Sequence, residues 1–474
     1  MSNNKKLVES ITSRDVDFSQ WYTDLCLKAE LMDYSTTQGF IIYRPLGYGI
    51  WENIQNYLNK QFRKTGHENV YMPLLIPESL FQKEKDHVSG FAPETAMVTT
   101  TGIEDLNERL LIRPTSEVLF GTHYSKIVKS YRDLPKLYNQ WCSVVRWEKT
   151  TRPFLRGKEF LWQEGHTVHA TAEEAMEETK TMLEVYNKLG KELLAIPFVT
   201  GKKTEKEKFA GALETYAIEA LMHDGQALQS GTSHYFGDEF AKAFDIKFLN
   251  KNNELEYAYQ TSWGVSTRLI GAIIMVHGDD NGLVLPPYVA PTQVVIIPIR
   301  PNDAVETAVG EIEEKLSKNF RVVVDNSDKS PGWKFSEHEM KGVPLRIEIG
   351  PRDLEAGSVQ VMFRHNYEKQ VVAIKDLESF VETGLKQMHE AMYQKALKST
   401  EDRTYEAQTY DAFKEFLKRG GYIKMSVSGE DAEIQIKEET GATARVILDE
   451  PMLTENCPVT GKKATQTILF ARAY

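Results

Sequence analysis

The chain has 474 residues, of which 41% are hydrophobic and 26% are charged, and its formal net charge is −11. This length predicts two to four domains, and no apolar run approaches the roughly 20 residues that a membrane span needs. The negative balance argues against a polycation that coats nucleic acid by charge alone. The N-terminus MSNNKKLVES lacks the apolar stretch of a secretory signal, so we expect a cytoplasmic protein without a membrane partner.

The first part of the chain is expected to be mainly helical. The apolar spacing of WYTDLCLKAELMDY and of GYGIWENIQNYLNKQFRKTG predicts helix over residues 1 to about 60, ending at Gly66. NVYMPLLIP predicts a short strand closed by prolines. Two strand-like runs follow between Leu137 and His169, separated by a polar loop with a proline. Thr171 and Glu174 then form a capping box for a helix that reaches toward Leu194.

The second half of the chain changes character after another strand and helix, YAYQTSWGVSTRLIGAIIMVHG. From TQVVIIPI onward, short apolar strands alternate with amphipathic helices, which predicts a small α/β domain over about 292–395. Residues 400–474 are expected to form a third mixed unit. No fixed-period repeat or low-complexity tract is present.

The familiar phosphate-binding loops are missing from this sequence. It contains neither G-x-x-x-x-G-K-[ST] nor a G-x-G-x-x-G after a strand, so a bound nucleotide would be held by side chains. KMSVS at 424–428 is interpreted as a chance match to a KMSKS loop, since no HIGH element precedes it. The three cysteines, Cys26, Cys142 and Cys457, are far apart and are expected to be reduced thiols.

The segment RWEKTTRPFLRGKEFLWQEGH, residues 146–166, concentrates charge and aromatic rings. Side chains alternate between the two faces of a strand. If the two runs pair as antiparallel neighbours, one face collects these side chains: Tyr138, Gln140, Cys142, Val144, Arg146, Glu148, Lys158, Phe160, Trp162, Glu164 and His166.

This face suits a planar base that carries a polyphosphate. Arginine grips phosphate or carboxylate oxygens with a rigid fork, Phe160 can stack on a base, and Glu148 can accept from an exocyclic amine. Arg156 lies in the loop where the outer phosphates would lie. The alternative, a salt-bridged solvent face, explains the charges but leaves Phe160 and Trp162 unexplained.

Three segments in order resemble the motifs of class II aminoacyl-tRNA synthetases. NVYMPLLIP, with Pro73, is similar to motif 1, VRWE followed by RGKEF to motif 2, and SWGVSTRLIGAII, with Arg268 entering a helix, to motif 3. Further stretches resemble the prolyl-tRNA synthetase branch of that class, so that the resemblance covers nearly the whole chain: RPTSE, FLWQEGHTVHAT, KTEKEKFAGA, LQSGTSHYFG, HGDDNGLVLPP and PGWKFSEHEMKGVPLRIEIGPRD.

The resemblance implies an α/β (α+β) chain of three domains, of the archaeal/eukaryote-like type without the editing insertion. These are a class II catalytic domain with an antiparallel sheet over 1–288, an α/β anticodon-binding domain over 289–398, and a small mixed C-terminal domain over 399–474. Relatives often hold zinc in four cysteines of the C-terminal unit. Only Cys457 is available here, so no zinc is expected. A homodimer is implied.

The resemblance also implies an enzyme that activates L-proline with ATP, aided by Mg²⁺, and transfers the prolyl group to tRNA(Pro). Arg146 and Arg268 are the implied catalytic residues. The implied proline contacts are Thr115, Glu117, Arg146, Trp162, Glu164, His234 and Phe91. The implied ATP contacts are Arg146, Glu148, Arg156, Phe160, Gln229, Thr232, Ser266 and Arg268. The terminal Tyr474 is expected near this site.

Four residues are candidates for reading the anticodon: Lys334, Arg346, Glu348 and Arg352. Arg346 and Glu348 could equally be an ion pair on a strand face.

Two other functions stay open at this point. One is a sister enzyme for threonine, serine or glycine, although a hydroxyl-specific or zinc-based pocket is not visible. The other is a noncatalytic RNA-binding relative, which usually loses a motif arginine, whereas Arg146, Arg156 and Arg268 are all present. Because a pocket for a small apolar amino acid discriminates poorly, some activation of alanine or cysteine is expected.

Overall fold

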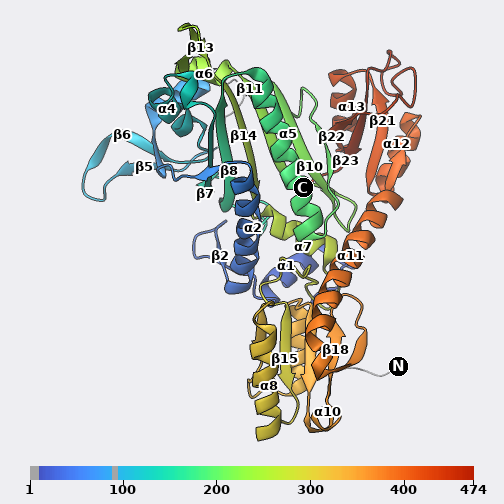
Figure 1. Ribbon diagram of the computed structural model, residues 1–474. Coiled ribbons are helices and arrows are strands. Elements are labelled where there is room, and N and C mark those ends of the chain that lie inside the picture. The colour runs from blue at the N-terminus through green and yellow to red at the C-terminus, as the bar shows by residue number, and fades with distance from the viewer. Residues whose placement is uncertain (1–9, 88–93) are drawn as a thin grey trace.

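The computed structural model describes residues 10–87 and 94–474. It is a mixed α/β chain built around a large, mostly antiparallel sheet (Figure 1). A smaller α/β domain lies below this sheet in the view, and the C-terminal elements lie at the upper right. The long helix α11 (Leu377–Asp402) runs from the smaller domain to the C-terminal elements.

The central sheet has eleven strands in the order β20-β21-β23-β22-β9-β10-β11-β14-β8-β7-β3. Helix α5 (Ala172–Leu189) crosses β10, β11 and β14 and continues into a π-helical turn. The strands from the first part of the chain are β3 (Glu68–Asn69), β7 (Lys136–Val145), β8 (Glu159–His169), β9 (Val199–Lys202), β10 (Glu214–Leu221), β11 (Ala227–Gly237) and β14 (Tyr259–Ser266).

Smaller elements surround this part of the sheet. Strand β6 pairs with β4 and β5 in a three-stranded sheet, and two hairpins, β1-β2 and β12-β13, stand apart. The helices are α1 (Phe18–Lys28), α2 (Pro45–Lys64), α3 (Glu78–His87), α4 (Glu117–Ile127), α6 (Glu239–Phe244) and α7 (Arg268–His277). The strands are β1 (Met32–Tyr34), β2 (Ile41–Tyr43), β4 (Leu75–Pro77), β5 (Met97–Thr100), β6 (Asp105–Ile112), β12 (Lys247–Leu249) and β13 (Leu255–Tyr257).

The N-terminal region corrects two sequence predictions. The predicted helix over residues 1 to about 60 is wrong in the middle, where Glu30 has a positive φ of 61° and the β1-β2 hairpin follows; residues 1–9 lie outside the described part. Helix α2 does end as predicted, because Gly66 adopts a φ of 84° that favours glycine. NVYMPLLIP, residues 69–77, supplies the last residue of β3 and all three residues of β4, and the chain between them, which contains Pro73, is not a strand.

The start of α5 matches its prediction in part. The Thr171 side chain accepts from the Glu174 N–H at 3.2 Å, as an N-cap should. The Glu174 carboxylate accepts instead from the Ala170 N–H, so only half of the predicted capping box forms.

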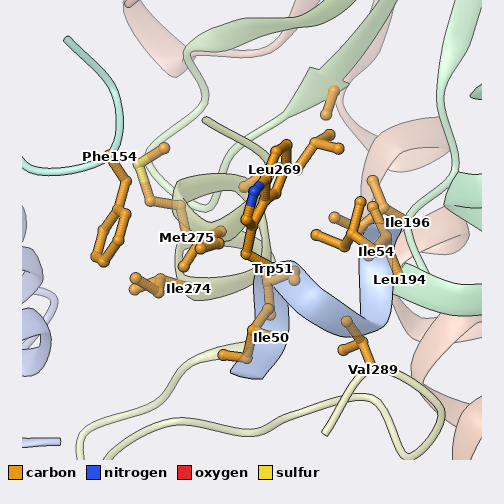
Figure 2. Close-up of a cluster of buried hydrophobic side chains, with 14 of the residues drawn as sticks. Ile50, Trp51, Ile54, Phe154, Leu194, Ile196, Leu269, Ile274, Met275 and Val289 are labelled. Atoms are coloured by element: carbon orange, nitrogen blue, oxygen red, sulfur yellow. The ribbon is translucent and has the colours of Figure 1, made fainter. Parts of the chain in front are cut away.

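The main hydrophobic core lies where α2 and α7 meet beneath the sheet (Figure 2). Trp51 from α2 and Leu269 and Met275 from α7 are buried in it. Phe154, from the loop between β7 and β8, is also buried at the edge of this cluster. Packing of this one ring therefore anchors the loop to the core.

The smaller domain contains the predicted alternation of strands and helices. Its sheet has the order β16-β15-β17-β18-β19, with β15 parallel to both β16 and β17. The elements are β15 (Val294–Pro298), α8 (Asp303–Leu316), β16 (Val322–Val324), α9 (Pro331–Met340), β17 (Leu345–Ile349), α10 (Pro351–Glu355), β18 (Ser358–Phe363) and β19 (Lys369–Ala373). The domain boundaries at 289 and 398 remain predictions.

The C-terminal strands extend the central sheet, because Ile447 of β22 pairs with Lys202 of β9. Buried charges hold this seam: Glu219 of β10 accepts from Lys203 at 2.9 Å and from both Nε and Nη2 of Arg445. The elements are β20 (Thr404–Glu406), α12 (Tyr410–Arg419), β21 (Tyr422–Val427), α13 (Glu430–Thr440), β22 (Thr443–Leu448) and β23 (Gln466–Ala471).

Candidate active site

A cavity of about 350 Å³ opens on the central sheet, beside β8, β11 and β14 and under the loop after β7. Phe91 lies outside the described residues. Every other side chain that the sequence assigns to proline or ATP lines this cavity: Thr115, Glu117, Arg146, Glu148, Arg156, Phe160, Trp162, Glu164, Gln229, Thr232, His234, Ser266 and Arg268.

Pairing of β7 with β8 forms the floor of the cavity. Cys142 lies opposite Trp162, and Val144 lies opposite Phe160, so the predicted antiparallel pairing is confirmed. The predicted extension of the first strand to Glu148 is wrong, because β7 ends at Val145 and Glu148 N–H donates to the Arg146 carbonyl at 2.7 Å. Arg146 and Glu148 therefore reach the cavity from a turn.

Arg146 is held by rings and a backbone carbonyl. Its guanidinium carbon lies 5.5 Å from the centre of the Phe160 ring and 5.3 Å from that of Trp162. Its Nε donates to the Pro114 carbonyl at 3.0 Å. Within the described residues no carboxylate forms an ion pair with it, and burial lowers its pKa although Glu117, Glu164 and Glu148 raise it. Its remaining donors can therefore meet an anion in the cavity.

Glu164 is the centre of a buried hydrogen-bond network. Its Oε1 accepts from Ser116 and from Gln140 Nε2 at 2.6 Å, and its Oε2 pairs with His166 Nε2 at 2.8 Å. Burial opposes ionisation of this carboxyl, yet the hydrogen bond and charge of His166 hold its pKa below the ordinary value. The same pairing outweighs burial and raises the pKa of His166. The network fixes a carboxylate at the cavity wall.

His234 supplies a neutral wall at the same end. Its Nδ1 bonds Thr215 at 2.9 Å and its Nε2 bonds Thr232 at 3.0 Å, while Phe209 packs 4.8 Å from its ring. Burial, followed by the charge of His166, lowers the pKa of His234 to about 3. Beside it, Thr115 Oγ1 donates to Glu117. This end thus combines rings, an uncharged imidazole and carboxylates.

Arg268, the first residue of α7, forms the opposite wall. Its Nε donates to the Leu155 carbonyl and its Nη1 to the Gln229 carbonyl, both at 3.2 Å. Burial and then the charges of Arg156 and Arg146 lower its pKa to about 10. Arg156 and Arg146 therefore lie close enough to act on Arg268, and this part of the cavity contains three guanidinium groups.

The loop between β7 and β8 is fixed at several points. Phe154 adopts a φ of 60°, which costs backbone strain, and packs edge-on 5.7 Å from Tyr43. Arg152 N–H donates to the Arg156 carbonyl at 2.7 Å, and its guanidinium lies 5.1 Å from the Tyr474 ring. Arg156 itself is exposed. The loop thus presents an accessible arginine from an anchored backbone.

Sequence reasoning assigned no role to several side chains that also line the cavity, namely His166, Phe154, Leu155, Glu207, Phe209 and Thr215. The alternation along β8 was a sufficient signal for His166. Phe209, in the loop before β10, and Thr215, on β10, lie far along the chain from β8 and reach the cavity only through pairing within the sheet.

The four anticodon candidates lie in the smaller domain, away from this cavity. Arg346 pairs with Glu348 at 2.9 Å and with Glu339 at 2.7 Å, so the ion-pair alternative is present in the structure. Lys334 is buried and donates to the Asp325 carbonyl at 2.8 Å. Arg352 of α10 is exposed. Their role in anticodon reading stays a prediction.

Neither a metal-binding cluster nor a membrane-spanning helix is present in the described part of the chain. No three His, Cys, Asp or Glu side chains in this part of the chain gather in a metal-binding arrangement. None of the helices in the described ranges has the length and apolar character that a membrane crossing needs.

Comparison with known families matches three consecutive parts of the chain. Residues 99–277 match the tRNA synthetase class II core domain (G, H, P, S and T), and residues 293–383 match the anticodon binding domain. Residues 410–474 match the family described as prolyl-tRNA synthetase, C-terminal.

Individual relatives match over their full length. The proline–tRNA ligase of Onion yellows phytoplasma (strain OY-M) is 63% identical over 470 residues, 99% of each chain. The proline–tRNA ligase of Ruminiclostridium cellulolyticum is 58% identical over 478 residues, 100% of each chain. The crystal structure of prolyl-tRNA synthetase from Cryptosporidium parvum, complexed with halofuginone and AMPPNP, superposes with a TM-score of 0.95. It is 37% identical and covers 100% of this chain and 99% of its own.

Proposed function

The chain belongs to the prolyl-tRNA synthetases of class II, and on this premise we propose that it activates L-proline with ATP and transfers the prolyl group to the 3′ end of tRNA(Pro). The observation that carries the proposal is that aromatic rings and carboxylates line one end of the cavity and three arginines line the other. The end with the rings and carboxylates suits a small cyclic amino acid, and the arginines suit its carboxylate and a triphosphate.

Proline would occupy the end of the cavity that contains Trp162 and His234. A compact apolar ring can be enclosed by these aromatic groups, and the neutral state of His234 avoids repulsion with the substrate's secondary ammonium. That ammonium has two N–H donors, which the oxygens of Thr115 and Glu117 can accept. Arg146 would hold the proline carboxylate next to the nucleotide.

ATP would occupy the end of the cavity between Phe160 and Arg268. The adenine would stack between the Phe160 ring and the Arg268 guanidinium, and Glu148 would accept from its exocyclic amine. Arg146 would contact the α-phosphate, and the exposed Arg156 the outer phosphates. Gln229, Thr232 and Ser266 line the same region and would make further contacts.

In the first step a carboxylate oxygen of proline attacks the α-phosphorus in line. The new P–O bond forms as the bond to the bridging oxygen breaks, and pyrophosphate leaves with that electron pair. Arg146, already oriented by the Pro114 carbonyl and two rings, stabilises the charge that develops on the α-phosphate. Arg268, oriented by two carbonyls, holds the nucleotide in place from the adenine side and adds positive charge. The terminal ribose hydroxyl of the tRNA then attacks the prolyl carbonyl carbon, AMP leaves and the hydroxyl proton is released.

No covalent enzyme nucleophile is needed. The thiol closest to the floor, Cys142, has a pKa raised well above its ordinary value by burial and by the charge of Glu164. A protonated, buried thiol is a poor nucleophile. Positioning and charge stabilisation therefore carry the reaction.

Mg²⁺ would accompany the nucleotide and neutralise charge on its phosphates. This ion usually takes most of its ligands from phosphate and water, with one or two protein oxygens. Gln229 is a cavity residue with a side-chain oxygen that could serve.

The tRNA would contact both ends of the molecule. The domain proposed for residues 289–398 would bind the anticodon, and the exposed Arg352 is the candidate with the most accessible side chain. Single-stranded bases are read by hydrogen bonds to their edges and by stacking. Arg352→Ala is expected to raise the KM for tRNA(Pro) without changing proline-dependent ATP–pyrophosphate exchange.

We further propose that the enzyme is a homodimer in the cytoplasm, where tRNA is charged. The segment that resembles the motif 1 dimer strand exposes Tyr71, Leu74 and Leu75 at 68%, 41% and 36% of their surfaces. Adjacent exposed apolar side chains favour a protein interface. Analytical ultracentrifugation should give a dimer for the intact chain and a shift to monomer for Tyr71→Asp.

The direct test of the activity is amino-acid-dependent ATP–pyrophosphate exchange with proline, alanine, cysteine, threonine and serine. Strong exchange with proline, and weak exchange with alanine or cysteine, is expected. Exchange that depends on threonine or serine would indicate that the chain is the related synthetase for that amino acid. Silence with all five would favour the noncatalytic RNA-binding alternative.

A further inference from the structure

A second cavity, of about 230 Å³, lies where the catalytic region, the smaller α/β domain and α11 meet. The end of α7 and the turn after β10 form one side, α11 forms another, and His365 after β18 closes the third. None of the residues proposed for proline, ATP or anticodon binding lines it. The volume is below the usual range for drug-sized ligands, so only a small ligand fits.

Three basic side chains line this cavity: Arg14, Lys395 and Arg403. Arg14 donates through Nη1 to the Gly278 carbonyl, and its Nε is buried without a hydrogen-bond partner. Arg403 donates to the carbonyls of Met222 and His223 and to Ser399. The side-chain donors of both arginines thus meet only neutral oxygens within the described residues.

Among the described residues of the cavity wall the only carboxylate is that of Asp279, which is already engaged. Both of its oxygens accept from Arg364, at 2.7 and 2.8 Å, and its charge also acts on Arg14. Asp15 lies outside the wall, 3.8 Å from His223. The described lining residues therefore include three cations and one carboxylate that Arg364 already pairs, although the whole chain carries a net charge of −11. Asp224, outside the wall, also acts on Arg403 and His223.

Three histidines complete the polar wall: His223, His277 and His365. These histidines line the same cavity as Arg14, Lys395 and Arg403. The charges of Arg14 and Arg403 help to lower the pKa of His223. The charge of Lys395 helps to lower those of His277 and His365. His365 Nδ1 is buried without a hydrogen-bond partner. A buried polar atom of this kind is costly unless a ligand or water satisfies it.

We propose that this cavity binds a small oxyanion of the phosphate class, with one or two phosphoryl groups. Such an anion would accept from Arg14, Lys395 and Arg403, and charge-assisted bonds of this type are strong. Because the walls come from different domains, the bound anion fixes the smaller α/β domain against the catalytic region. It also stabilises the folded chain by mass action. The site does not depend on the function of the first cavity.

The test is isothermal titration calorimetry of the full chain with sodium phosphate and, separately, sodium pyrophosphate, at constant ionic strength set with sodium chloride. The variants are Lys395→Met and Arg14→Met. One control is Lys398→Met, since Lys398 lies on the same helix but pairs with Asp402 and does not line the cavity. The other is Arg156→Met, which removes a cation from the first cavity.

An anion-binding event in the wild type is expected whose Kd is at least about tenfold weaker in Lys395→Met and Arg14→Met and unchanged in Lys398→Met. Pyrophosphate, the product of the first cavity, is expected to bind there as well, and Arg156→Met weakens only that additional event. Loss of binding in Arg156→Met alone would assign the anion to the first cavity and overturn the proposal. Absence of binding by the wild type would also overturn it. Circular dichroism of each variant confirms that a loss of binding is not a loss of fold.

Discussion

Arg346, Arg364 and Arg445 are buried, and each meets a carboxylate at 2.7–2.9 Å. Arg146 and Arg268, in the candidate active site, donate instead to backbone carbonyls, and within the described residues neither has an ion-pair partner. A cation with its own carboxylate holds the fold together. An arginine without a carboxylate partner can pair with a negatively charged substrate instead. The proposed substrates, proline and ATP, supply a carboxylate and three phosphates.

The first prediction breaks a paired site. Glu219→Gln leaves Lys203 and Arg445 buried without their carboxylate at the seam between β10 and β22. The free energy of unfolding should fall by about 3–5 kcal/mol, the scale for an uncompensated buried charge. Urea unfolding measures it. Glu214→Gln is the matched control, because Glu214 lies on the same strand but its pair with Lys202 is partly exposed. Equal losses in the two variants would contradict the comparison.

The second prediction removes an unpaired cation. Arg146→Ala should slow proline-dependent ATP–pyrophosphate exchange by about 10²–10³, the scale for one preorganised transition-state donor. Lys149→Ala, in the same loop and 85% exposed, should leave the rate unchanged. A loss below threefold for Arg146→Ala would rule out its proposed role.

The third prediction uses pH to sharpen the comparison. Burial opposes ionisation of Asp279, but Arg364 lowers its pKa below the ordinary 3.8. Between the pKa of Asp279 in the folded chain and 3.8, its value in the unfolded chain, the unfolded chain binds more protons. The stabilisation from the Asp279–Arg364 pair is therefore complete above pH 3.8 and is lost as the pH falls through the folded pKa. Asp279→Asn should therefore cost about 1.5–3 kcal/mol at pH 7.

That cost should be the same at pH 7 and pH 5 and should shrink only below pH 3.8. Urea unfolding of the wild type and Asp279→Asn across this range measures it. A cost that already disappears between pH 7 and pH 5 would show that another group controls the effect.

The smallest effect is expected at a paired arginine on the surface. Arg109 donates to both oxygens of Glu78, but the two side chains are 57% and 38% exposed. Solvent screens such pairs, so Arg109→Ala should change the free energy of unfolding by about 0–1 kcal/mol. A larger change would mean that pairing, rather than burial with pairing, determines stability here.

The sequence predicted the parts of this comparison that depend on local pattern. Alternation along β8 placed Phe160, Trp162 and Glu164 on one face, and the family resemblance added Arg268 and His234. The sequence could not show which arginines pair with a carboxylate, because Arg445 and its partner Glu219 are 226 positions apart in the chain. The β1-β2 hairpin was missed because the apolar spacing on both sides of it is helical.

The central claim is that Arg146 is left unpaired for substrate. Its most direct test is urea unfolding of Arg146→Met and the wild type, each alone and with saturating proline plus ATP. Without ligands, Arg146→Met should lose at most about 1–2 kcal/mol of stability, because it breaks no ion pair and gives up only a hydrogen bond to the Pro114 carbonyl and longer-range contacts. The ligands should raise the unfolding midpoint of the wild type and leave that of Arg146→Met nearly unchanged. A strongly destabilised Arg146→Met that still gains the full increase from the ligands would contradict the claim.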